Sequence, residues 1–210
     1  MTSLSTQKLW QHATQWHRRS APRGKNRVPP LLFMTDQQRI PDPVAVIESL
    51  PSGAGVVLRD YDLAERRALA ADLSAVCGKN GIILLIGADA ELAQRVGAAG
   101  VHLPEYMVHR APALRRQYPR FLWTGAAHSY TALVRAERTM LDAALLSPIF
   151  ATASHPGSAF LGTPRAAQMV QRSDIPILAL GGIDASNVGR LNGAGFSGLA
   201  AIGALAEQAG

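Results

Sequence analysis

The sequence predicts one parallel (β/α)8 barrel (a TIM barrel) that follows a short helical and basic N-terminal extension. Three observations lead to this fold class. Eight short apolar runs alternate with longer segments of helical character. The runs are continuously apolar, as expected of parallel strands that are covered on both faces. Glycine-rich segments follow the last two runs, at the place where such barrels usually bind phosphate.

The extension is predicted to occupy residues 1–29, and the barrel domain residues 30–210. Within the extension, residues 5–16 favour a helix, because Leu9, His12, Ala13 and Trp16 would share one face. A segment rich in proline, glycine and arginine then breaks this helix before the first strand. The whole chain of 210 residues fits one domain near the lower end of the size range of the fold.

Strands and helices are expected to alternate through the barrel domain. The predicted strands are residues 31–34, 55–58, 82–86, 100–103, 121–124, 143–146, 175–179 and 198–201. The predicted helices are residues 63–77, 90–96, 111–117, 130–140, 163–172 and 185–192. A doubly wound open sheet is the alternative, but no glycine-rich dinucleotide fingerprint follows the first strand. We therefore favour the closed barrel.

Composition excludes several classes of protein. Hydrophobic residues make up 48% of the chain and charged residues 17%, which allows a sizeable core and argues against overall disorder. No apolar stretch is long enough to span a bilayer, and no secretory leader begins the chain. The single cysteine, Cys77, excludes an internal disulfide. We expect a cytoplasmic protein with no membrane partner.

The formal net charge is +6, and five of the 21 basic residues lie in the short run from residue 17 to residue 27. Aromatic residues do not interleave with that run, and zinc spacing is absent, so we expect no nucleic-acid partner. The positive field favours a small anionic substrate such as a phosphate ester. The sequence leaves a homo-oligomer open.

Glycines after strands 7 and 8 form the first candidate site. Gly181 and Gly182 follow strand 7, and Ile202 and Gly203 follow strand 8. Glycine lets the main chain approach an anion closely, and the first N–H groups of a following helix would point at it. Tight turns without a ligand are the alternative. Together the two motifs indicate a phosphate site.

Four more residues at the predicted strand ends could act on a substrate. Arg59 follows strand 2 and could bind phosphate, or else pair with Asp60 or another carboxylate at the mouth. His128 follows strand 5 and could act as an acid or base, or else hold a loop in place. Thr152 and Ser154, in the loop after strand 6, are candidate substrate donors, with local turn bonding as the alternative. No metal-ligand spacing is present, so we name no metal ligands.

The order of motifs resembles the family of thiamine phosphate synthase and its paralogue TenI. The resemblance covers residues 31 to about 205 and rests on these segments taken in order: Leu-Phe-Met-Thr-Asp36, Val-Val-Leu-Arg59, Gly-Val-His-Leu103, Ala-Ala-His-Ser129, Ser-Pro-Ile-Phe150-Ala-Thr152, Leu-Gly-Gly-Ile183 and the run from Gly195 to Ile202.

That resemblance implies a function in thiamine biosynthesis. The synthases join a pyrimidine methyl diphosphate to a thiazole phosphate, with Mg2+ assisting departure of the diphosphate. By resemblance, the thiazole phosphate would bind main-chain amides near Gly182 and Ile202-Gly203, with Thr152 close by. Mg2+ would be needed only if the synthase activity is retained.

The other half of the family site departs from the pattern. The glutamine and lysine that flank the strand 2 arginine are replaced by Val57 and Tyr61, and Gly87-Ala88 replaces an asparagine–aspartate pair. Asp89 lies one step away and could partly substitute. Met107 replaces the metal-binding aspartate, with Glu105 nearby.

Two more positions of the family site also change. Ala126 replaces a serine, and His155 replaces a lysine of the strand 6 loop. Several missing charges should leave little coupling activity, because each such donor typically contributes about 10²–10³ in rate.

Three functions therefore stay open. The first is an enzyme that moves a proton on a phosphorylated thiazole, as TenI does. By the resemblance Pro148 stands where TenI has its acid/base histidine, so His128 or His155 would have to act in its place. The second is a divergent but active thiamine phosphate synthase. The third is a non-catalytic protein that binds a phosphorylated ligand or a partner.

Overall fold

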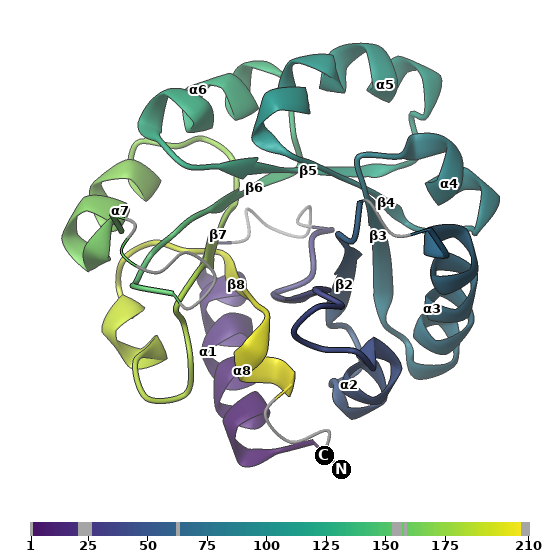
Figure 1. Ribbon diagram of the computed structural model, residues 1–210. Coiled ribbons are helices and arrows are strands. Elements are labelled where there is room, and N and C mark those ends of the chain that lie inside the picture. The colour runs from purple at the N-terminus through teal and green to yellow at the C-terminus, as the bar shows by residue number, and fades with distance from the viewer. Residues whose placement is uncertain (1, 21–26, 62–63, 153–156, 158, 207–210) are drawn as a thin grey trace.

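A computed structural model describes residues 2–20, 27–61, 64–152, 157 and 159–206 of the chain. Eight parallel strands form a closed barrel in which each strand pairs with its neighbour in chain order, and β8 returns to β1 (Figure 1). The strands are β1 Leu31–Met34, β2 Gly55–Leu58, β3 Ile83–Gly87, β4 Gly100–Leu103, β5 Leu122–Ala127, β6 Ala143–Leu146, β7 Ile177–Leu180 and β8 Gly198–Ala201. The (β/α)8 fold class is confirmed.

Helices surround the barrel in an outer layer (Figure 1). The α-helices are α1 Leu4–Ser20, α2 Pro43–Ser49, α3 Arg66–Asn80, α4 Ala90–Arg95, α5 Ala111–Gln117, α6 Tyr130–Arg138, α7 Gly162–Val170 and α8 Gly203–Ala206. Two 3-10 helices, η1 Glu105–Arg110 and η2 Val188–Leu191, follow β4 and β7. Within the described residues, no helix combines the length and apolarity needed to cross a membrane.

Local sequence explains several helix ends. Asp42 accepts hydrogen bonds from the main-chain N–H groups of Val44 and Ala45, and Pro43 opens α2. Ser129 caps α6 in the same way through the N–H of Ala132. Gly81 ends α3 in the left-handed region, with a φ of 66°. Side-chain caps and glycine therefore set these boundaries.

Three predictions of local structure were wrong. Helix α2 was not predicted, because its seven residues are too few to show a clear helical period. The helix expected over residues 185–192 is a turn followed by the 3-10 helix η2. The helix expected from residue 163 begins one residue earlier, at Gly162, and the buried Oγ1 of Thr163 has no hydrogen-bond partner among the described residues.

Strand side chains form two separate apolar clusters, because successive residues of a strand point to opposite faces. One cluster fills the barrel interior and the other lies between the strands and the outer helices. The interior cluster contains Val28, Leu32, Met34, Val57, Leu85, Leu122, Ala143, Leu145, Leu178 and Ala200. The interior is therefore packed with side chains and does not form a channel.

The predicted extension packs against the barrel. Helix α1 contacts β1, β8, η2 and α8, and Figure 1 shows it beside β8. Its buried residues are Thr6, Leu9, Ala13 and Trp16. His12 Nδ1 and Trp16 Nε1 both bond Asn192 Oδ1, at 3.1 and 3.0 Å. Val28, just before β1, belongs to the interior cluster. Helix α1 and the end of the extension therefore both contribute to the core.

Packing of α1 can be tested with two leucines of the same helix. Leu9 is fully buried, whereas Leu4 is 82% exposed. We expect Leu9→Ala to lower the free energy of unfolding by about 2–5 kcal/mol. Leu4→Ala should change it by less than about 0.5 kcal/mol. Urea unfolding followed by circular dichroism measures both. Equal, small effects would show that α1 is not part of the folded core in solution.

Candidate functional site

Carboxyl groups after β1 and β2 bind protein donors at the barrel mouth. Thr35 Oγ1 donates to Asp60 Oδ2 at 2.5 Å, and the N–H of Gln37 donates to Asp60 Oδ1 at 2.7 Å. Asp36 Oδ2 pairs with Arg39 at 2.6 Å and with Arg59 at 3.0 Å. Partial burial acts to raise the pKa of Asp36, but the hydrogen bond and charge of Arg39 and the charge of Arg59 together lower it. Arg59 is thus paired with a mouth carboxylate, and its other N–H groups are still able to meet a phosphate.

Tyr61 lies over the end of β3. A Cβ atom added at Gly87 would come within 2.8 Å of the Tyr61 ring, so the glycine makes room for that ring. Arg66 lies 5.8 Å from the ring centroid and donates to the carbonyl of Gly87 at 2.5 Å. Partial burial raises the pKa of Tyr61, against the opposing charge of Arg59. Tyr61, Arg66 and Gly87 therefore form one packed unit.

Asp89 belongs to the structure of α4. Its Oδ1 accepts the N–H of Leu92 at 2.8 Å as the N-terminal cap, and its Oδ2 lies 3.7 Å from Arg66 Nη1. Both oxygens thus face protein donors. This arrangement gives no support to the idea that Asp89 substitutes for the missing family carboxylate.

The side chain of His128 contacts Glu105 across two neighbouring loops. The loop after β5 presents His128, and the first residue of η1 after β4 is Glu105. Glu105 Oε2 lies 2.7 Å from His128 Nδ1 and also accepts the main-chain N–H of His128 at 2.8 Å. The His128 side chain is 54% exposed, so the rest of its ring is open to a ligand.

His102 lies buried beneath these groups, on β4. Its Nδ1 is 3.0 Å from Thr124 Oγ1 on the neighbouring strand. Burial, together with smaller contributions from the charges of Arg59 and His128, lowers the pKa of His102 to about 3. Arg59 and His128 follow β2 and β5, and so they lie at the same carboxyl-terminal end of the barrel. His102 is therefore a packed, buried histidine.

Gly181 and Gly182 both have positive φ, at 98° and 65°. A Cβ at Gly182 would come within 2.2 Å of the carbonyl oxygen of Ala151, and one at Gly181 within 2.9 Å of Pro148 Cα. Only glycine fits this close approach between the β7 and β6 loops. The two glycines therefore have a structural role whether or not a ligand binds.

The segments after β7 and β8 keep main-chain N–H donors available. Among the described residues, the N–H groups of Gly182, Ile183 and Gly203 donate to no hydrogen-bond acceptor. Asn187 Nδ2 holds the carbonyl of Gly182 at 2.8 Å, which fixes the turn. Because no α-helix follows Gly182, the helix dipole expected there is missing, and only the individual N–H groups remain.

The loops after β6 and β8 carry the other predicted residues. Ile202 is half-buried at the end of β8 and packs against both apolar clusters. Thr152 is half-buried in the loop after β6 and engages in interactions within the protein. Ser154 and His155 lie outside the described residues. The mouth thus brings Arg59 and His128 near His102, while Gly182 and Gly203 follow the adjacent strands β7 and β8.

Mg2+ needs several oxygen ligands in a near-octahedral arrangement. Five described carboxylates in the loops at the mouth are bound to protein donors: Asp36, Asp60, Asp89, Glu105 and Asp184. In the same ranges, no three His, Cys, Asp or Glu side chains are grouped to hold a metal ion. The donors described at the mouth do not fit a Mg2+ diphosphate site.

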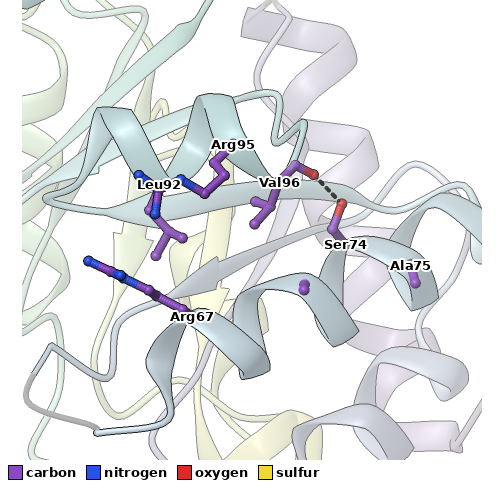
Figure 2. Close-up of a pocket in the computed structure, with 7 residues that line it drawn as sticks. Arg67, Ser74, Ala75, Leu92, Arg95 and Val96 are labelled. Carbon is purple, nitrogen blue, oxygen red and sulfur yellow. Dashed lines mark hydrogen bonds between the residues drawn. The ribbon is translucent and has the colours of Figure 1, made fainter.

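A surface cavity of about 430 Å³ lies elsewhere, between α3 and α4. Arg67 and Arg95 line this cavity together with the apolar side chains of Leu92 and Val96 (Figure 2). The Ser74 hydroxyl donates to the carbonyl of Val96. This cavity is on the outer helical layer, and no acid/base side chain lines it. Since chemistry in these barrels occurs at the carboxyl ends of the strands, we assign the candidate site to the mouth.

Comparison with known families decides the relationship. A family model described as thiamine monophosphate synthase matches residues 31–205, which is most of the chain. The chain belongs to the thiamine monophosphate synthase family. The resemblance seen in the strand motifs is therefore confirmed, and it places the chain in a family of thiamine biosynthesis.

Individual members of the thiamine monophosphate synthase family agree. Thiamine-phosphate synthase of Chlamydia caviae is 32% identical over 182 residues, covering 83% of this chain and 86% of that protein. The Methanoculleus marisnigri enzyme of the same name is 35% identical over 165 residues, covering 74% and 76%. The solved thiamine phosphate pyrophosphorylase from Pyrococcus furiosus is 19% identical with a TM-score of 0.73, covering 88% and 93%, which supports the shared fold.

Two features of this family member were not predicted as part of the site. The sequence places Glu105 only beside a replaced metal ligand, because residue spacing does not show that its side chain reaches the next loop. Tyr61 and Gly87 were seen as two separate replacements. Their shared position at the ends of adjacent strands is the signal that could have linked them.

Burial of neutral His102 predicts a dependence of stability on pH. Between pH 6.5 and about 3 the unfolded chain protonates this histidine and the folded chain does not. The free energy of unfolding should therefore fall as the pH is lowered through this range, by up to about 1.4 kcal/mol per unit. His102→Asn should flatten that slope in urea unfolding at pH 7, 6, 5 and 4. The exposed His109→Asn is the control, and parallel curves for wild type and His102→Asn would contradict the prediction.

Proposed function

We propose that this chain binds a phosphorylated thiazole and moves a proton on it, as the TenI members of the family do. The observation that carries the proposal is the contrast between the two sides of the mouth. The N–H groups of Gly182, Ile183 and Gly203 have no acceptor among the described residues. Asp89 and Glu105, which follow β3 and β4 across the barrel, are already bound to protein donors. This contrast supports binding of a phosphorylated ligand at one half of the two-substrate site of the family.

A phosphate ester suits the available half. Main-chain N–H groups that converge on an anion bind it without a compensating cation, and glycine allows the close approach. Arg59 adds a guanidinium at the mouth that is able to bind phosphate while it keeps its contact with Asp36. Thr152 and Ser154, in the loop after β6, complete the proposed set of phosphate and substrate contacts.

Proton transfer is the chemistry that the other side of the mouth supports. A tautomerisation requires no metal and no leaving group, only a base that takes a proton and returns it. His128 is exposed at the mouth and is held by Glu105, and we assign it this role. His155 is the second candidate acid/base, in the loop after β6.

The packed unit of Tyr61, Arg66 and Gly87 argues against the coupling reaction. It stands where the family has a lysine and an asparagine that face a diphosphate. An aromatic ring over a glycine provides no positive charge for the departing group, and Arg66 is committed to the Gly87 carbonyl and to Asp89. An active, divergent synthase is therefore the second candidate function. A non-catalytic phosphate-binding protein is the third, and it predicts binding without turnover.

Removal of one main-chain donor tests the phosphate site. Gly203 is the first residue of α8, where proline is tolerated but contributes no N–H. We expect Gly203→Pro to weaken binding of thiazole phosphate about ten- to hundred-fold, which is the value of one hydrogen bond to a charged group. Isothermal titration calorimetry measures the Kd.

Gly203→Ala is the matched control, because it keeps the N–H and its Cβ would meet no atom within 4 Å. It should bind as tightly as the wild type. Equal Kd values for the proline and alanine variants would exclude this donor, and no binding by the wild type at millimolar ligand would reject the proposed function.

The synthase alternative has its own assay. We expect no thiamine phosphate above background when the chain is incubated with thiazole phosphate, pyrimidine diphosphate and Mg2+. The physical reason is that several charged groups needed for diphosphate departure are missing, each typically contributing about 10²–10³ in rate. Product detection by chromatography decides it, with a family member that is an active synthase as positive control. Steady product formation would establish the second function in place of the first.

A further inference from the structure

We propose that Glu105 is the positioning residue that sets His128 as the base of this site. The inference rests on the proposed proton transfer and extends it by assigning which ring nitrogen reacts and what holds it. Glu105 touches no substrate in this scheme. It acts through the imidazole, by orienting the ring and by fixing the position of its hydrogen.

The geometry restrains the histidine at two points. Glu105 Oε2 accepts both the main-chain N–H of His128, at 2.8 Å, and the Nδ1 hydrogen of its ring, at 2.7 Å. The first contact locks the start of the loop after β5, and the second locks the rotation of the ring. One carboxylate oxygen therefore fixes the main chain and the side chain of the same residue.

The tautomer follows from the partner. A carboxylate is only an acceptor, so Nδ1 must carry the hydrogen in the neutral ring. Nε2 then has a lone pair and lies on the side of the ring away from Glu105. An imidazole whose Nδ1–H is held by a carboxylate is the arrangement that generally prepares Nε2 to take a proton.

The site is placed for substrate. The His128 side chain is 54% exposed, whereas Glu105 is 31% exposed, so the ring is more open than its partner. His128 directly follows β5 and Arg59 directly follows β2, so both lie at the carboxyl ends of the parallel strands, on the same side of the barrel. His102 is already bonded to Thr124 and is not available as the base.

The step that we assign is a balanced proton shift. Nε2 takes a proton from one atom of the thiazole ring system, and the electron pair of that bond moves into the ring as a neighbouring double bond shifts. The resulting imidazolium, stabilised by the Glu105 carboxylate, returns the proton to a second atom of the ligand. Nothing is oxidised, reduced or released, and Glu105 keeps its charge throughout.

A structural staple between two loops is the competing interpretation, and a double-mutant cycle separates the two. We expect Glu105→Gln to lower kcat about ten- to hundred-fold with KM changed less than about two-fold. His128→Ala should lower kcat by at least about 10². If Glu105 acts through His128, the double variant is no slower than His128→Ala alone.

The exposed Glu48→Gln, on α2, is the matched control and should keep wild-type kcat and KM. Unchanged kcat in Glu105→Gln, or effects that multiply in the double variant, would overturn the assignment. A fall in thermal midpoint with a raised KM and unchanged kcat would identify a structural staple.

A substrate-free measurement keeps the test independent of the proposed function. In 15N NMR of the full chain labelled at its six histidines, His128 is identified by the signal that His128→Asn removes. We expect the wild type to show the Nδ1–H form. Glu105→Gln should lose its predominance, because an amide donates as well as accepts.

Failure of the proposed function and failure of the positioning role of Glu105 give different results. If the wild type does not convert the thiazole phosphate tautomer but shows Nδ1–H that depends on Glu105, the proposed function fails and the positioning role stands. If the wild type shows Nε2–H, the positioning role fails whatever the turnover.

Discussion

Pairing of β1 with β8 is the contact on which the rest of the structure depends, because it closes the barrel and sets the strand ends in one ring. The N–H of Leu199 donates to the carbonyl of Pro30 at 2.9 Å at the start of this pairing. A Cβ at Gly198 would come within 2.4 Å of the same carbonyl oxygen, so the absence of a side chain allows the two strands to meet. Without this closure, the ends of β2, β5 and β8 would not face one common mouth.

The sequence predicts a segment of the fold well where the residue pattern allows only one kind of structure. Five strands have the predicted bounds, because short apolar runs between turn residues leave little freedom in a parallel sheet. Segment 185–192 was misjudged, since its composition allows a helix but Asp184 binds the N–H groups of Ser186 and Asn187 and favours a turn. Backbone competition by such side chains is hard to read from periodicity alone.

The site was predictable where it depends on the main chain and less so where it depends on contacts between loops. Gly182 and Gly203 mark strand ends by their residue type. The sequence names Asp60 or another mouth carboxylate as the partner of Arg59. The structure instead pairs Arg59 with Asp36, and Asp60 accepts from Thr35 and Gln37. The contact between Glu105 and His128 joins residues 23 positions apart in the chain, and no local pattern signals it.

Contacts between the β6 and β7 loops would couple a bound anion to the order of both loops. Ile149 and Phe150 donate their N–H groups to the carbonyls of Leu180 and Gly181, both at 3.0 Å, and Gly182 packs against Ala151. The two loops therefore share one set of hydrogen bonds. A ligand that rigidifies the glycine turn would also order the loop after β6. By thermodynamic reciprocity, any contact that orders that loop would raise the affinity for the ligand.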